Sequence, residues 1–168
     1  MATQSPSRPQ YADDFYLWAL DQAERLREMA ALRRNEPLDW EDLAEEVEEL
    51  ARSDRRACES HIEQIIAHLL KLEFSTATTS RGHWAVEVTQ LRLDLEKIFT
   101  PSLRRLVKQG MPQRWRGGRR LAQVSAQLHE PEMERRLPAD CPYSFEQVLG
   151  ADDWLPEPSA AQSVTRPL

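Results

Sequence analysis

The residues with the clearest chemical potential form a basic stretch. Residues 101–120 contain seven basic side chains and no acidic one. Arginine and lysine contact phosphates, and an aromatic ring among them can stack on an unpaired base. Trp115 lies inside the stretch, just before Gly117 and Gly118. The candidates for contact with single-stranded nucleic acid or with another protein are Arg104, Arg105, Lys108, Arg114, Trp115, Arg116, Arg119 and Arg120.

Residues 36–49 have the opposite character, with eight carboxylates and no base. Glu45 and Glu49 are one helical turn apart, with Glu46 between them, and paired carboxylates can divide acid and base roles. A run of glutamates on a helix is more often a solvated face. We therefore favour pairing with the arginines of residues 104–120, either within the chain or between two copies.

Two histidines, His61 and His68, are seven residues apart and would share one face of a helix. Two imidazoles hold a metal only when further ligands, such as Cys58 or a carboxylate, complete the set. No HExxH or Glu-x-x-His pattern surrounds them. We expect His68 to be a half-buried histidine bonded to a carbonyl or carboxylate, and His61 to lie near the surface.

Helices must position all of these side chains. Residues 38–74 read as nearly uninterrupted helix with Asp39 as N-cap, and Leu43 and Leu50 belong to its apolar stripe. Ser53 leaves open whether residues 39–74 form one helix or two. A helix before this one should begin near Asp13 or Asp14 and end at residues 35–37, and a third long helix should follow Ser80.

The C-terminal third is predicted to contain shorter elements. A short helix should cover residues 102–109. The next helix should be regular only from Arg119 to His129, because Gly117 and Gly118 together cost about 2 kcal/mol relative to alanine. Ser144 and Gln147 form a capping box for a last short turn.

Composition agrees with a helical fold. Of 168 residues, 40% are apolar and 30% charged, and only five are glycine. We expect an all-α irregular bundle of three long helices and two or three short ones. It should form a single domain over residues 11–150, with a disordered tail at 1–10 and a mostly disordered one at 151–168.

Net charge and cysteine content indicate where in the cell the protein works and which partners it binds. The net charge of −6 argues against general polyanion binding, and Cys58 and Cys141 are too far apart in the sequence to suggest a CxxC motif. No signal peptide or membrane span is visible in the sequence. We therefore expect a reduced, cytoplasmic protein without a membrane partner.

Several short motifs resemble a known family. They are Tyr11–Phe15 with Trp18, Leu38-Asp39 with Leu43–Glu48, His68–Lys71, Pro101–Leu103 and Cys141–Ser144. In this order and spacing, over roughly residues 11–150, they are similar to the bacterial family of domain of unknown function twenty-nine. The resemblance implies a small all-helical bacterial domain with no assigned activity, cofactor or partner. Leu72 and the Gly117-Gly118 pair depart from the family pattern.

These observations favour a binding protein over an enzyme. No nucleophile elbow, phosphate-binding loop or complete catalytic set is present in the sequence, and no cofactor is indicated. We expect a cytoplasmic bacterial module for protein–protein interaction, which binds an unidentified protein or a second copy of itself. The alternative is a nucleic-acid-binding accessory protein that uses residues 104–120. A third hypothesis is a metal-dependent enzyme built on His61 and His68.

Overall fold

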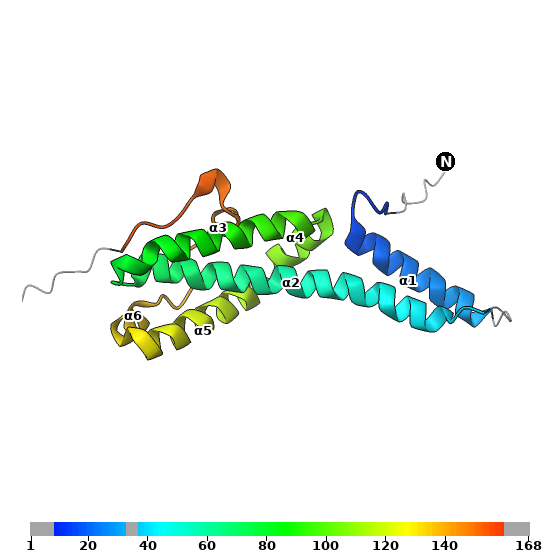
Figure 1. Ribbon diagram of the computed structural model, residues 1–168, viewed down its shortest axis with the longest axis horizontal. Helices are drawn as coiled ribbons and strands as arrows, with labels where there is room; N and C mark the ends of the chain where they lie inside the picture. The colour runs from blue at the N-terminus through cyan, green and yellow to red at the C-terminus, as the bar shows by residue number, and fades with distance from the viewer. Residues whose placement is uncertain (1–8, 33–36, 160–168) are drawn as a thin grey trace, which may run out of the picture. The chain divides into compact units, whose positions relative to one another are not determined.

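A computed structural model describes residues 9–32 and 37–159. The expected tail at 1–8, the predicted helix end at 35–36 and residues 160–168 lie outside this part. The described residues form helices and no strand (Figure 1), so the predicted all-α fold is confirmed. The elements are α1 (Phe15–Ala31), α2 (Trp40–Phe74), η1 (Thr78–Ser80), α3 (Arg81–Ile98), α4 (Pro101–Gln109), α5 (Met111–His129), α6 (Pro131–Arg136), α7 (Phe145–Leu149) and η2 (Ala151–Asp153).

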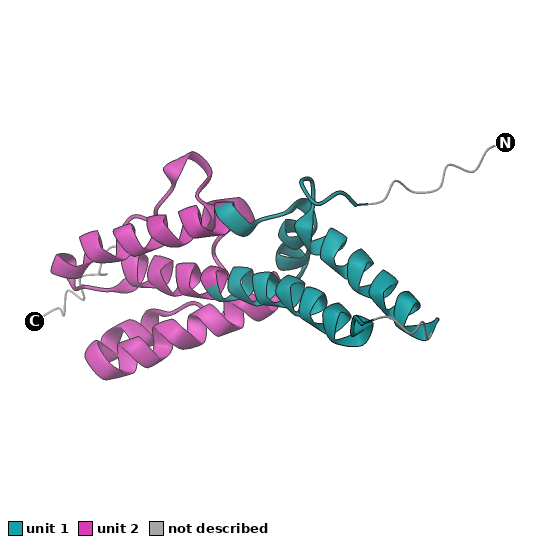
Figure 2. Cartoon of the chain, turned by 45° about the vertical axis from the view of Figure 1, so that its right-hand side comes forward, with its two compact units in different colours: residues 1–60, 97–109 teal, residues 61–96, 110–168 magenta. Residues whose placement is uncertain are grey.

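The chain divides into two compact units (Figure 2). Unit 1 contains residues 1–60 and 97–109, and unit 2 contains residues 61–96 and 110–168. Helix α2 is one continuous helix of 35 residues, so Ser53 neither ends it nor caps a new one. Its first part belongs to unit 1 and its last part to unit 2. The single domain predicted over residues 11–150 stays a prediction.

Small residues hold unit 1 together where α1 lies beside the first part of α2 (Figures 1 and 2). Four alanines are fully buried, namely Ala19, Ala23, Ala44 and Ala51. Because small side chains let the helix backbones approach closely, the larger neighbours Leu43 and Leu50 lie outside the contact. Their exposed fractions are 39% and 56%. The expectation that these leucines belong to a core-facing stripe is wrong for this reason.

Asp14 connects the starts of α1 and α4 within unit 1. Its carboxylate accepts a hydrogen bond from the Leu17 N–H at 3.1 Å, which confirms it as the N-cap of α1. It also accepts the backbone N–H and the hydroxyl of Ser102, at 2.9 and 2.7 Å. Burial by itself would raise the pKa of Asp14, but these hydrogen bonds outweigh it and hold the pKa below its ordinary value.

The core of unit 2 is built on the last part of α2, which lies between α3 and α5 (Figure 1). The buried residues recur every three or four positions, as an amphipathic helix requires. The largest fully buried side chains of this unit are Ile62, Ile65, Ile66, Leu69, Leu70, Leu72, Val88, Leu95 and Val148.

Helix α5 runs unbroken from Met111 through both glycines, so the prediction of a regular helix only from Arg119 is wrong. A Cβ atom at Gly118 would lie 2.6 Å from the backbone oxygen of Glu63 and 2.7 Å from the Cβ of Ile66. Glycine is therefore required where α5 crosses α2, and the packing that it permits offsets its low helix propensity.

Arg92 attaches α7 and the segment after it to α3. Its guanidinium donates to the backbone carbonyls of Gln147, Val148 and Trp154, at 2.7, 3.1 and 3.0 Å. The predicted capping box is confirmed, since the Ser144 hydroxyl accepts the Gln147 N–H and the Gln147 side chain accepts the Ser144 N–H.

The described part of the expected C-terminal tail also contacts unit 2. The Ser159 N–H donates to the carbonyl of Glu73 at 2.7 Å. The Tyr143 hydroxyl donates to the carboxylate of the same glutamate at 2.7 Å. Glu73 therefore joins the end of α2 to two segments that are far from it in the sequence.

Candidate functional site

The basic stretch at 101–120 is divided between two helices in different units. Arg104, Arg105 and Lys108 are exposed on α4 in unit 1, whereas Arg116 and Arg120 are exposed on α5 in unit 2. The fold thus distributes the predicted contact residues over two separate helix surfaces.

Three residues of this stretch make contacts within unit 2. Arg114 forms an ion pair with Glu63 at 2.8 Å, and Arg119 donates to the carbonyl of Pro138 at 2.7 Å. Trp115 is only 6% exposed, and its indole N–H donates to the carbonyl of Ala139 at 3.1 Å. The expectation that Trp115 could stack on a base is therefore wrong, because tertiary packing covers its ring.

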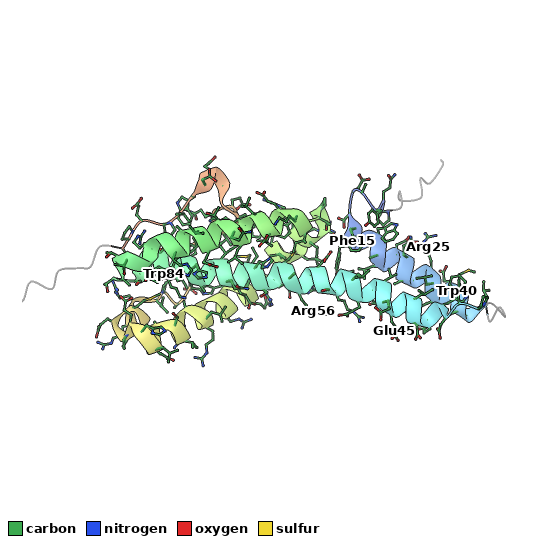
Figure 3. The ribbon with its side chains drawn as sticks, viewed as in Figure 1. Phe15, Arg25, Trp40, Glu45, Arg56 and Trp84 are labelled. Atoms are coloured by element: carbon green, nitrogen blue, oxygen red, sulfur yellow. The ribbon has the colours of Figure 1, made fainter. Side chains whose placement is uncertain are left out.

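The acidic stretch contributes to ion pairs inside unit 1. Glu48 pairs with Arg27 and with Arg52, and Glu49 pairs with Arg56. Glu45, which is labelled in Figure 3, is exposed, and Glu46 is exposed as well. The described ion pairs of Glu48 and Glu49 are with α1 and α2, so for these two glutamates the predicted pairing with residues 104–120 is not found.

His68 differs from its expected environment. Its Nδ1 atom is buried without a hydrogen-bond partner among the described residues, and the same holds for Nδ1 of His61. Burial, reinforced by the charge of Lys71, lowers the pKa of His68 to about 4, so its imidazole is neutral at neutral pH. Within residues 9–32 and 37–159, no three potential metal ligands gather around either histidine.

This environment predicts a pH-dependent stability. Between about pH 7.5 and pH 5 the unfolded chain protonates His68 while the folded chain does not, so stability is lost as the pH falls. After allowance for partial solvent screening, the wild type should lose about 1 to 2 kcal/mol more than the His68→Gln variant over this range. Urea denaturation at both pH values measures the difference.

The matched control is His129→Gln, because His129 is exposed at the end of α5 and is not among the groups that shift the pKa of His68. This variant should keep the pH dependence of the wild type. If His68→Gln and His129→Gln showed the same dependence, the neutral state of His68 in the folded protein would be refuted.

Helix α5 presents an uncovered amphipathic surface, which we call the outer face of α5. Leu121, Val124 and Leu128 have exposed fractions of 47%, 41% and 71%. Their spacing of three and four residues places them on one side of the helix. Arg116 and Arg120 are exposed in the preceding turns. Sequence reasoning that concentrated on charge missed the three apolar residues, although their helical spacing is visible in the sequence.

These features define a protein of the all-helical class with a packed core and an exposed amphipathic helix. The model of the family described as domain of unknown function DUF29 matches residues 10–155, so the chain belongs to this family and the predicted resemblance is confirmed. The crystal structure of an α-helical protein of unknown function from Rhodospirillum rubrum is similar, with a TM-score of 0.69 and 25% sequence identity over 87% of this chain and 92% of that chain. No curated protein matches the chain. Among the described helices, none is long and apolar enough to cross a membrane.

Proposed function

We propose that the protein is a bacterial, cytoplasmic interaction module whose outer face of α5 binds an acidic amphipathic helix of a partner protein. The observation that carries the proposal is the juxtaposition of three exposed apolar residues with two exposed arginines on one helix.

The apolar residues provide the contact area. Leu121, Val124 and Leu128 have the i, i+3, i+7 spacing with which one amphipathic helix docks on another. Complete burial of a fully exposed leucine or valine contributes about 1.5 to 3 kcal/mol, and a partner that covers the exposed half of Leu121 or Val124 would gain about half of that. Together they support specific binding of a second helix.

The arginines indicate the charge of the partner. Arg116 and Arg120 form no ion pair or hydrogen bond with another described residue, and α5 contains no acidic residue. Glu134 borders the face. Hydrogen bonds from Gln123 and Gln127, at 2.8 and 2.7 Å, lower the pKa of its carboxyl group, and the charge of Arg120 adds to this effect without forming an ion pair. Exposed cations beside an apolar surface favour an acidic partner and steer its approach. The burial of Trp115 favours a protein over single-stranded nucleic acid, because no other aromatic residue lies in residues 101–120.

Photo-crosslinking in the native cells tests this proposal with the full chain. A photoreactive residue at position 124 should form an adduct with an acidic, amphipathic segment of another protein, identified by mass spectrometry. The double variant Arg116→Glu and Arg120→Glu should reduce the adduct about tenfold, because the charge complementarity is reversed. The matched double variant Arg104→Glu and Arg105→Glu, on α4, should leave it unchanged.

A photoreactive residue at Thr89, exposed on α3, is the positional control. Equal adduct yield at positions 89 and 124 would contradict the proposal. A second copy of this chain, or a nuclease-sensitive adduct, would also contradict it and would indicate self-association or nucleic-acid binding instead.

A further inference from the structure

A hollow of about 490 Å³ lies in unit 2 near the C-terminal end of α2. Lys71 lines it from α2, Ser75 from the segment directly after α2, Trp84 from α3, His129 from α5 and Met133 from α6. Trp84 is labelled in Figure 3. The volume lies within the range of about 300 to 1,000 Å³ that is typical of small-molecule sites.

Lys71 is a cation without a counter-ion in this hollow. Lys71 is half-buried, and its ammonium forms no hydrogen bond or ion pair with another described residue. Burial lowers the pKa of Lys71 below its ordinary value. Because a partly desolvated charge is costly unless it is paired, an anion that entered the hollow would be stabilised there.

The carboxylate of Glu130 also lines the hollow, but it is already hydrogen-bonded to neighbouring residues. It accepts hydrogen bonds from the Ser75 hydroxyl at 2.5 Å and from the N–H and hydroxyl of Thr76, both at 2.6 Å. Arg136 lies 3.7 Å from it. Although burial raises its pKa, these hydrogen bonds hold the pKa of Glu130 below the ordinary value, so it remains an acceptor. Glu130 is thus satisfied by its neighbours, and the ammonium of Lys71 is left for a ligand.

The other walls favour a planar, apolar group. Trp84, Ala126 and Met133 contribute apolar surface, and Ser80 and Ser125 contribute neutral hydroxyls. An indole ring stacks on planar groups, and a methionine side chain adapts to their edges. A phosphate ester, with about two negative charges, fits less well than a monoanion because Glu130 already contributes a negative charge to the same hollow.

We propose that this hollow binds a small aromatic carboxylate, whose carboxylate pairs with Lys71 and whose ring lies against Trp84. None of the residues that line this hollow belongs to the outer face of α5, so the hollow would be a second binding site, for a small molecule, in the proposed interaction module. Neither Lys71 nor Trp84 has a signal in the sequence that would single it out, since the two residues belong to different helices.

Nuclear magnetic resonance of the full chain tests the proposal with 1-naphthoate and its neutral analogue 1-naphthamide as probes. Naphthoate should shift the indole N–H signal of Trp84, assigned with Trp84→Phe, in a saturable way. Naphthamide should bind about tenfold more weakly, and Lys71→Met should weaken naphthoate about tenfold, since one charge-assisted hydrogen bond is lost. Inorganic phosphate should leave the Trp84 signal in place.

Two controls separate ligand binding from folding. Arg105→Met removes an exposed cation on α4 and should leave naphthoate affinity unchanged. The buried indole N–H of Trp115 reports whether each variant keeps its packing, and Lys71→Gln replaces Lys71→Met if the latter loses that signal. Equal affinity for acid and amide, unchanged affinity in the folded Lys71 variant, or no Trp84 shift at millimolar naphthoate would overturn the proposal.

Discussion

Replacing Asp14 with alanine is expected to lower the free energy of unfolding by about 3 kcal/mol. The carboxylate caps α1 through Leu17, and such a cap contributes about 1 kcal/mol. The same buried carboxylate accepts two hydrogen bonds from Ser102 in the first turn of α4. Alanine would leave those donors without their acceptor, which costs about 1 to 3 kcal/mol more. Chemical denaturation at neutral pH measures the loss.

Asp13→Ala is the matched control, because Asp13 is adjacent but exposed. It should change stability by less than about 0.5 kcal/mol. Since the pKa of Asp14 is lowered in the folded chain, its contribution is present at neutral pH and is lost as the pH falls through that lowered pKa. The Asp14→Ala variant should therefore lose less stability in acid than the wild type. A loss of only about 1 kcal/mol at neutral pH would show that Asp14 acts as a simple cap and that its bonds to Ser102 contribute nothing.

Gly118→Ala should destabilise the protein by about 2 kcal/mol, although alanine is the better helix former by about 1 kcal/mol. The added methyl group would meet the backbone oxygen of Glu63 at 2.6 Å. A backbone atom cannot move aside as the end of a side chain can, so α5 would have to shift away from α2. Thermal and urea denaturation should both report the loss.

Gly82→Ala has the opposite expected sign. Gly82 lies in the first turn of α3, and nothing lies within 4 Å of its Cβ position. Alanine there should raise stability by about 0.5 kcal/mol, because the unfolded chain loses conformational freedom. If both alanine variants were stabilising, the close approach of α5 to α2 at Gly118 would be refuted.

Much of the helical content could be predicted because its signals are local. The caps at Asp14 and Asp39, the capping box of Ser144 and the apolar spacing in α2 lie within a few residues of the structure that they specify. The length of α5 was not predictable in the same way. Gly118 is unfavourable within its own helix and becomes favourable only through Glu63 and Ile66, which come from another helix.

The candidate sites also combine features that are visible in the sequence with features that depend on tertiary packing. The basic residues of 101–120 are evident in the sequence, but their exposure depends on packing, which covers Trp115 and leaves Arg116 in solvent. The outer face of α5 could have been found from the spacing of Leu121, Val124 and Leu128. The hollow between Lys71 and Trp84 could not, because its walls come from four helices.

Local sequence signals are enough to predict the all-α class, most helix starts and the family to which the chain belongs, since caps, periodicity and motif order are properties of neighbouring residues. Which polar groups meet and which apolar residues stay exposed depends on tertiary packing. Asp14 and Ser102, for example, are 88 residues apart and have no local signal for each other. Their hydrogen bonds exist because folding brings the starts of α1 and α4 together, and the free energy of such contacts depends on burial, which a linear pattern does not specify.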